Sequence, residues 1–426
     1  MRTPSTRTPG LRIPPASRGP ALARCVEPVA ADTFLAEYFE RRPLVLERDA
    51  AAGFDDLLSE TDVARLAGSS VLRTPAIRLV KAGESITQSD YTVDVPWRPT
   101  AFTDVADPGR VAALFAEGAT VVIQGLHHWW EPLAVFCRAL ELELGHAVQA
   151  NAYYTPRDSQ GLPVHHDTHE VFVLQVAGEK RWLVYEPVLE LPLRDQRYRG
   201  EMGAPGEPVQ DVVLRPGDTL YLPRGWLHEA VTSHADSLHL TVGVNVYTWT
   251  EAVQAALAEA AADLELRRSV PPSGVGAAEV VRALEARLEP EAVARRMRGR
   301  FVRTRRSILP DQMAQLRALR GLGLETPVER RPTVVAELAR AGGRVTLAFE
   351  GKRVAFPAAV ADEVKFAAAA DAEFRAADLP GGLDEEGRLV LVRRLVREGF
   401  LRISERALAA PSLDGDGDGT ASAPHT

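Results

Sequence analysis

The sequence has few of the features that mark secreted, membrane-spanning or repetitive proteins. Only Cys25 and Cys137 are cysteines, too few for a disulfide framework and typical of a reducing cytosol. No apolar run approaches the roughly 20 residues that cross a bilayer, and no internal repeat is visible. The N-terminal stretch is rich in Arg, Pro and Ser but lacks the apolar segment of a secretory signal. We therefore expect a cytoplasmic protein without a membrane span.

Basic residues are also in the minority. The chain has 50 Lys and Arg against 58 Asp and Glu, a net charge of −8, which argues against broad binding of nucleic acid but permits a local basic patch. Apolar residues make up 46% and charged residues 25%, as in ordinary globular proteins. A length of 426 residues predicts two or three domains with ample capacity for a buried core.

The middle of the chain has the pattern of an all-β domain. From His146 to about Tyr247, short β-rich runs such as AVQANAYYT, KRWLVYEP and SLHLTVGVNVYTW are separated by Gly/Pro turns. Runs of this length predict a barrel or jelly roll. Helices and a buried strand at 119–123 precede this region, so the overall class is α+β.

The remainder of the chain is predicted to be mostly helical. An Ala-rich helix follows Thr250 and stops before Pro271. Further on, we expect a helix over 334–342, a hairpin turning at Gly351 and a helix that ends at Gly399, which together suit a winged-helix module. The predicted boundaries are a disordered tail at 1–22, a barrel at 23–250, a helical region at 251–310, a winged-helix-like domain at 311–408 and a disordered tail at 409–426.

Three side chains form a candidate metal site. His165 and Asp167 stand at the head of the long run VHHDTHEVFVLQV, where residues two apart on a strand share one face. The segment RPGDTLYLPRGWLH supplies His228 after a turn. Two histidines and one carboxylate are the minimal protein ligand set of a non-haem Fe(II) oxygenase and leave coordination positions open.

Other histidines are weaker candidates. His166 faces away from its neighbours, whereas His169 shares the face of His165 and Asp167 and is either an outer hydrogen-bonding group or a competing ligand. We interpret the remaining histidines of the folded region without such a context as structural or surface residues: His127, His128, His146 and His234.

At these residues the chain resembles the Jumonji-C-type 2-oxoglutarate oxygenases, and within them the ribosomal oxygenase (cupin-4) branch. The matching stretches cover most of residues 32–250 and read FLAEYFERRPLVLER, NAYYTPRDSQGLPVHHDTHEVFVLQVAGEKRWLVYEP, GDTLYLPRGWLHEAVTS and SLHLTVGVNVYTW. The resemblance implies a cupin-like double-stranded β-helix, a homodimer formed through helices after the barrel, and a winged-helix-like end.

The resemblance also implies roles for individual residues. His165, Asp167 and His228 correspond to the iron ligands, and Lys180 to the basic residue that holds the distal carboxylate of 2-oxoglutarate. A tight hairpin at Gly178 is expected to return Lys180 toward the metal. The remaining positions that match groups near the co-substrate, each of which also suits ordinary core hydrogen bonding, are Asn151, Tyr153 and His239.

The implied activity is Fe(II)-, 2-oxoglutarate- and O2-dependent hydroxylation of a protein side chain, most of all in a ribosomal protein. Three alternatives stay open: hydroxylation of a small molecule, demethylation of methylated lysine, and a non-catalytic cupin-like binding protein. The Ala-rich helix after Thr250 is either a dimer interface or part of an intramolecular bundle. The basic segment 295–306 suits contact with ribosomal RNA or an acidic partner, although a solvated helix face is the favoured interpretation.

Overall fold

The computed structural model describes residues 20–48, 53–69, 72–232, 234–287 and 290–408, and the chain divides into two compact units, 1–293 and 294–426. This division falls inside the predicted helical region 251–310. Within the described ranges, no helix combines the length and apolar character needed to cross a membrane.

The predicted tails lie mostly outside the described residues. Residues 409–426 are not described, and of 1–22 only the end is. That end is helical: α1 (Ala21–Val26) begins before the expected start of order near Ala23. The backbone N–H groups of Ala21 and Leu22 donate to the Glu143 carboxylate at 2.7 and 3.0 Å, so a distant side chain fixes the first turn.

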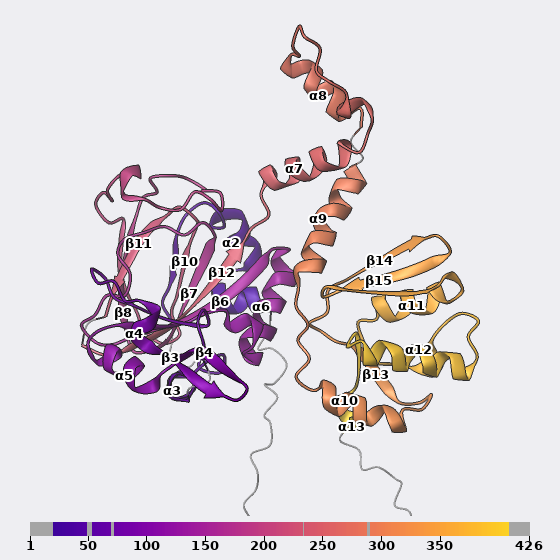
Figure 1. Cartoon of the computed structure of the whole chain (residues 1–426), viewed down its shortest axis with the longest axis horizontal. Helices are drawn as coiled ribbons and strands as arrows, with labels where there is room; N and C mark the ends of the chain where they lie inside the picture. The colour runs from indigo at the N-terminus through magenta and orange to yellow at the C-terminus, as the bar shows by residue number, and fades with distance from the viewer. Residues whose placement is uncertain (1–19, 49–52, 70–71, 233, 288–289, 409–426) are drawn as a thin grey trace, which may run out of the picture. The chain divides into compact units, whose positions relative to one another are not determined.

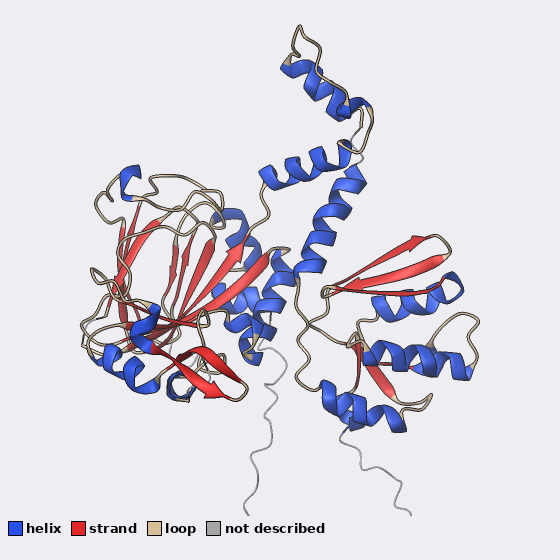
Figure 2. Ribbon diagram, in the orientation of Figure 1, coloured by secondary structure: helices blue, strands red, loops and turns tan. Residues whose placement is uncertain are grey.

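Two antiparallel sheets form the core of the first unit (Figures 1 and 2). The seven-stranded sheet has the order β1-β10-β7-β12-β6-β5-β2, with β1 (Leu44–Leu46), β2 (Ile77–Val80), β5 (Thr120–Ile123), β6 (Ala147–Thr155), β7 (Glu170–Ala177), β10 (Thr219–Leu222) and β12 (Ser237–Asn245). The three-stranded sheet has the order β11-β8-β9, with β8 (Lys180–Tyr185), β9 (Gln210–Leu214) and β11 (Leu227–Val231).

The seven-stranded sheet has an outer and an inner face. Leu238, Leu240 and Val242 of β12 belong to the main apolar core with Phe172 of β7. Helices α1, α2 (Ala31–Glu37) and α6 (Glu131–Leu144) supply the other side of this core. The inner face meets the three-stranded sheet through a smaller apolar cluster that includes Val173 and Trp182. Alternate residues of each strand therefore face either the helices or the second sheet, and the two facing sheets form the predicted barrel.

The other elements of the first unit surround these sheets. Before the barrel are α3 (Glu60–Gly68), α4 (Gln88–Tyr91), the hairpin β3 (Thr92–Trp97) and β4 (Thr100–Ala106), α5 (Pro108–Ala116) and the 3-10 turn η2 (Leu126–His128); later come η3 (Gly200–Met202), α7 (Trp249–Ala260), η4 (Glu265–Arg267) and α8 (Ala277–Glu285). The predicted long Ala-rich helix ends early, at Ala260. The Asp263 carboxylate accepts from the Glu265 N–H at 2.7 Å and stabilises a turn in place of further helix.

The second unit has its own apolar core and two small sheets, β17-β13-β18 and β14-β15-β16. Its helices are α9 (Pro290–Thr304), which begins just before the division, α10 (Gln312–Ala318), α11 (Ala361–Ala369), α12 (Glu385–Arg397) and α13 (Glu405–Leu408). Its strands are β13 (Pro327–Arg330), β14 (Ala336–Ala341), β15 (Arg344–Phe349), β16 (Lys352–Pro357), β17 (Phe374–Arg375) and β18 (Leu401–Ile403), and its 3-10 turns are η5 (Leu319–Gly321), η6 (Ala358–Val360) and η7 (Ala376–Asp378).

One predicted helix of this unit is wrong. Residues 336–341 form β14, which pairs with β15 in antiparallel register, Leu338 opposite Leu347. The helix-forming composition of this stretch is overridden because Leu338 packs against the second apolar core from the sheet. The predicted hairpin turning at Gly351 and the helix before Gly399 are confirmed.

Candidate metal centre

Two of the predicted ligands, His165 and Asp167, lie in a loop, and the third, His228, lies on strand β11. His165 lies between β6 and β7 and forms an isolated antiparallel bridge with His228, at N···O distances of 3.1 and 2.8 Å. The expected long strand from Val164 is wrong, because β7 begins only at Glu170. His165 is held by the edge of β11 instead, and the carbonyl of Asp167 accepts from the Gly225 N–H at 3.0 Å.

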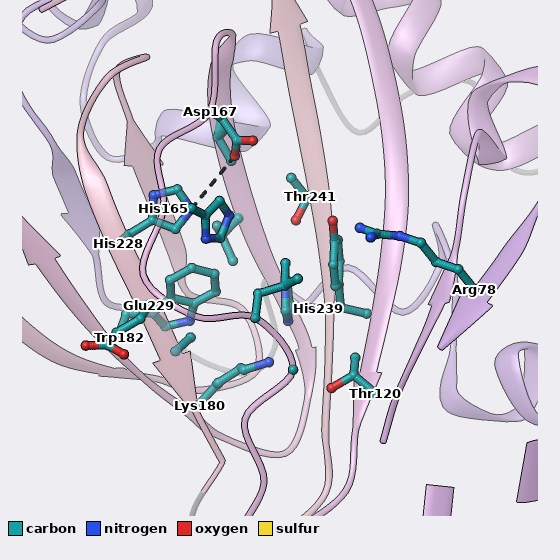
Figure 3. Close-up of a pocket in the computed structure, with 16 residues that line it drawn as sticks. Arg78, Thr120, His165, Asp167, Lys180, Trp182, His228, Glu229, His239 and Thr241 are labelled. Carbon is teal, nitrogen blue, oxygen red and sulfur yellow. Dashed lines mark ion pairs between the residues drawn. The ribbon is translucent and has the colours of Figure 1, made fainter. Parts of the chain in front are cut away.

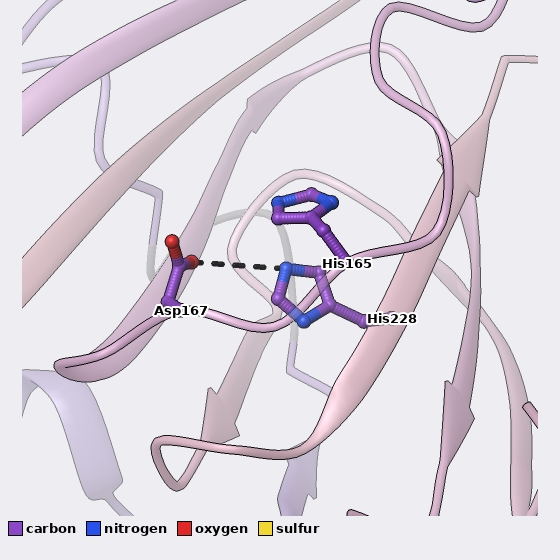
Figure 4. Close-up of side chains that lie close together, drawn as sticks. All are labelled: His165, Asp167 and His228. Carbon is purple, nitrogen blue, oxygen red and sulfur yellow. Dashed lines mark ion pairs between the residues drawn. The ribbon is translucent and has the colours of Figure 1, made fainter. Parts of the chain in front are cut away.

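The structure brings the three side chains together (Figure 4). One ligand atom from each of His165, Asp167 and His228 lies within 4.8 Å of the others, and His228 Nε2 is 3.8 Å from Asp167 Oδ2. The Nδ1 atoms of His165 and His228 lie 2.8 and 3.0 Å from the carbonyl oxygens of Pro163 and Trp226. Since a carbonyl only accepts, each Nδ1 carries the proton and each Nε2 presents a lone pair to a metal.

The electrostatics of the cluster also suit metal binding. Burial, together with the neighbouring His165, lowers the pKa of His228 to about 4, so the imidazole is neutral at pH 7. Burial acts to raise the pKa of Asp167, but His169 and His228 outweigh it, and the net pKa is below its ordinary value. A neutral imidazole and an ionised carboxylate are the forms that coordinate divalent cations.

The adjacent histidines take other partners. His166 is buried, with Nε2 3.1 Å from the Gln196 carbonyl oxygen and its ring against Tyr198. His169 Nε2 lies 3.0 Å from Gln149 Nε2 and 4.0 Å from Asp167 Oδ1. His169 is therefore beside the cluster as a hydrogen-bonding neighbour, whereas His166 faces away from it.

Lys180 lies in the same cavity as the three predicted ligands (Figure 3). Its Nζ donates to Thr155 Oγ1 at 2.9 Å, and among the described residues no carboxylate pairs with it. Burial lowers the pKa of Lys180 to about 7. An anion that enters the cavity would strongly stabilise the protonated form of this amine.

The chain reaches Lys180 by a different route from the one expected. Strands β7 and β8 belong to different sheets, so the turn at Gly178 is no hairpin and carries the chain from one sheet to the other. Gly178 has a φ of +61°, and a Cβ there would lie 1.8 Å from the Asp236 carbonyl oxygen. Only glycine fits this crossing.

The three weaker co-substrate candidates separate into two groups. Tyr153 and His239 are paired residues of β6 and β12, line the cavity and stack with ring centroids 5.0 Å apart. Burial, followed by Lys180, lowers the pKa of His239 well below its ordinary value. Asn151 is not among the lining residues. Its Oδ1 accepts from the Gly125 N–H at 2.9 Å and fixes the turn after β5.

Sequence reasoning missed Arg78, which enters the cavity from β2 (Figure 3). Its guanidinium lies beside the Tyr153 phenol, whose pKa is raised by burial first and then by Asp167, while Arg78 acts to lower it. Thr120 and Thr241 also line the cavity. A signal was present: in IRLV, Arg78 alternates with the buried Ile77 and Leu79, as an inward-facing polar residue would.

Residues 128–252 match the family model described as the JmjC domain. One curated relative, the bifunctional lysine-specific demethylase and histidyl-hydroxylase NO66 of Drosophila persimilis, is 34% identical over 223 residues, covering 52% of this chain and 31% of the relative. Another, ribosomal oxygenase 2 of Mus musculus, is 32% identical over 222 residues, covering 51% and 45%. The chain thus spans less than half the length of these curated relatives.

The fold has a solved counterpart in Escherichia coli ribosomal oxygenase YcfD, whose structure in complex with cobalt and 2-oxoglutarate matches with a TM-score of 0.53. The match covers 88% of this chain and 98% of that one. At 20% sequence identity it shows that the two chains share a fold and no more. The predicted cupin-like architecture is confirmed, and the chain contains a JmjC domain over residues 128–252, with homologues among the ribosomal oxygenases.

Proposed function

We propose that this chain is an Fe(II)- and 2-oxoglutarate-dependent oxygenase that hydroxylates a protein side chain. One observation carries the proposal: a buried lysine without a carboxylate partner among the described residues shares a cavity with a cluster of two histidines and one carboxylate. The first group fits the distal carboxylate of a dicarboxylic acid, and the second fits Fe(II).

In this proposal His165, Asp167 and His228 hold the iron through Nε2, a carboxylate oxygen and Nε2. Fe(II), when bound, supplies the redox chemistry that couples O2 and decarboxylation of 2-oxoglutarate to oxidation of a C–H bond. Lys180 binds the distal carboxylate by a charge-assisted hydrogen bond, which orients the co-substrate. Val171 and Val173 of β7 and Trp182 of β8 line the cavity with apolar surface and limit the access of water.

We propose that the substrate is a ribosomal protein. The curated relatives support this choice through ribosomal oxygenase 2, and the second unit supports it because an enzyme of small molecules would need only the barrel. Mass spectrometry of ribosomes from cells with and without this gene would show one peptide lighter by an oxygen atom when the gene is absent. Unchanged ribosomal peptides would eliminate this substrate.

A direct assay separates the chemistry from the substrate. Purified protein with Fe(II), 2-oxoglutarate and O2 is expected to form succinate, faster when a peptide substrate is present. Formaldehyde released from a methyl-lysine peptide would assign demethylation, which the name of the Drosophila relative includes. Absence of succinate with every peptide, despite bound metal, would refute the proposed activity.

We propose that the helical region 251–310 forms a homodimer interface. Helix α7 (Trp249–Ala260) begins just before this region, and along it Trp249, Val253 and Leu257 recur at helical spacing and are 88%, 58% and 55% exposed. A contiguous apolar stripe of this kind marks an interaction surface. We expect Trp249→Glu to convert a dimer into a monomer in light scattering, whereas Val390→Glu, at an exposed apolar position of α12, leaves the mass unchanged. A monomeric wild-type protein would contradict this interface.

The second unit is consistent with the proposed winged-helix-like domain, with β14–β16 as the wing and α10–α12 as the helices. The preceding basic segment 295–306 does not require nucleic acid as a partner, since Arg305 is 9% exposed and stacks on the Phe301 ring at 4.8 Å. We propose a cytoplasmic location on the basis of the low cysteine content.

A further inference from the structure

A buried ion pair links the first residue of β7, which follows the loop of His165 and Asp167, to the turn that precedes His228 on β11. Arg224 Nη1 donates to Glu170 Oε1 at 2.7 Å, and the two side chains are 6% and 0% exposed. Glu170 opens β7 just after the loop of Asp167, and Arg224 lies in the turn that leads to His228. The pair therefore joins the two halves of the metal cluster from outside it.

The pair belongs to a hydrogen-bond network with Tyr221 and Glu40, although Arg224 Nε has no hydrogen-bond partner in the described structure. Glu170 Oε2 accepts from the Tyr221 hydroxyl at 2.5 Å, and that hydroxyl accepts from the Glu40 N–H at 2.9 Å. Arg224 Nη1 also contacts the Glu40 carboxylate. Burial raises the pKa of Glu170 even though Tyr221 and Arg224 oppose it, so removing either donor leaves a buried carboxyl with poorer solvation.

Backbone contacts transmit this network to the ligands. The Gly225 N–H, next to Arg224, donates to the Asp167 carbonyl at 3.0 Å, and His165 and His228 exchange two backbone hydrogen bonds. Gly225 has a φ of +94°, and a Cβ there would lie 2.4 Å from the Leu189 carbonyl oxygen. The turn that carries Arg224 therefore has little freedom to shift without moving Asp167 or His228.

We propose that Arg224 and Glu170 are positioning residues that hold the Asp167 loop against the His228 turn, so that the three ligand atoms converge before metal binds. This inference rests on the proposed function, because it takes the cluster to be a metal site. A buried ion pair is weak evidence for stability, since desolvation offsets much of its attraction. Its place between the Asp167 loop and the turn before β11 gives it a specific role, the support of ligand geometry.

A second buried ion pair provides a matched control. Arg138 Nε donates to Glu141 Oε2 at 2.9 Å on α6, with side chains 5% and 7% exposed. This pair lies in the same unit but contacts neither ligand loop through the hydrogen bonds described above. Arg224→Met and Arg138→Met therefore remove equivalent charges from equivalent burial, and any difference in metal binding reports the position of the pair.

The experiment uses Co(II) alone as the probe, with the full-length chain. For Arg224→Met we expect Co(II) affinity to fall about 10- to 100-fold and the visible ligand-field spectrum of the bound ion to change. For Arg138→Met we expect a lower Tm with affinity and spectrum like those of the wild type. Wild-type affinity and spectrum in folded Arg224→Met would overturn the positioning role.

Two further outcomes are decided by the same assay. If Arg224→Met does not fold, Tyr221→Phe removes only one hydrogen bond from Glu170 and is expected to weaken Co(II) binding by a smaller factor; an unchanged affinity in this variant also overturns the inference. If the wild-type chain does not bind Co(II), the proposed function itself fails. If the wild type binds Co(II) and Arg224→Met binds it equally well, the positioning role is refuted and the proposed metal site is not.

Discussion

The two faces of the seven-stranded sheet use the same strands for opposite purposes. On β12, Leu238, Leu240 and Val242 face the helices and are fully buried among apolar side chains. The alternate residues His239 and Thr241 face the cavity. One period-two pattern thus supplies both a core and a reactive site, separated by the thickness of a backbone.

The cavity between the two sheets contains buried ionisable groups that lack ordinary partners. Lys180 is buried with one hydroxyl partner, and His239 Nδ1 has no hydrogen-bond partner in the described structure. Each of these groups costs folding free energy until a ligand satisfies it. The apolar core on the outer face stabilises the fold. The buried polar groups of the cavity offset part of that stability, and they are the groups that can bind a ligand.

The largest expected effect is the loss of activity on removal of a ligand that lines the cavity. Asp167→Ala removes the one anionic ligand of the cluster, so Fe(II)-dependent succinate formation should become undetectable. Its melting temperature should fall slightly in the metal-free protein, because the lowered pKa of Asp167 means that the folded state favours the ionised carboxylate. Succinate release measures the first and calorimetry the second; retained turnover would show that the ligand assignment is wrong.

On the outer face the expected effect is the reverse. Leu240→Ala creates a cavity in the main core and should lower the free energy of unfolding by about 2 to 5 kcal/mol. At low temperature, where the variant is folded, kcat should stay near the wild-type value. Urea denaturation measures the change in stability, with Val281→Ala, at a 59% exposed site of α8, as the control. A collapse of kcat in folded Leu240→Ala would break the separation of the two faces.

Lys180→Met should move stability and binding in opposite directions. Affinity for 2-oxoglutarate should fall by roughly 100-fold, because a buried carboxylate loses its charge partner. The melting temperature should rise, since methionine fills the site without a poorly solvated amine. Calorimetric titration with 2-oxoglutarate in the absence of O2, together with thermal unfolding, tests both. Weakened binding with no gain in Tm would mean that Lys180 is already well satisfied in the free protein.

The smallest expected effect is a pH dependence of the same site. The pKa of Lys180 is about 7 in the free protein against an ordinary 10.5, and a bound carboxylate raises it. At a pH between the pKa of Lys180 in the free protein and its higher pKa in the complex, Lys180 takes up a proton when 2-oxoglutarate binds. Affinity for 2-oxoglutarate should therefore decline as pH rises above about 7, by at most tenfold per pH unit. In the same window the unfolded chain holds a proton that the folded one lacks, so stability from this group increases with pH.

Calorimetry in buffers of different ionisation enthalpy would detect the proton uptake. Lys180→Met should abolish the slope of affinity against pH that the lysine contributes. A slope that persists in this variant would assign the dependence to another group.

The sequence predicted the barrel and the ligand spacing better than it predicted local structure. Alternation in β6, β7 and β12 follows from burial and is readable along the chain. The strand β14 was predicted as a helix because its composition favours one, and only pairing with β15 decides otherwise. Likewise, Gly178 indicated a turn but not that the turn connects two sheets.

The sequence by itself determined which side chains are available: a His-x-Asp pair, a distant histidine after a Pro-Gly-rich turn, and a lysine after Gly178. Their chemistry follows from residue type alone. The tertiary structure decided which of them meet. It joins His165 to His228 through an isolated antiparallel bridge, brings Arg78 into the cavity from a strand far upstream, and leaves Asn151 outside it with a backbone partner. The reason is that sheet register and crossings between sheets depend on long-range pairing, which no local pattern specifies.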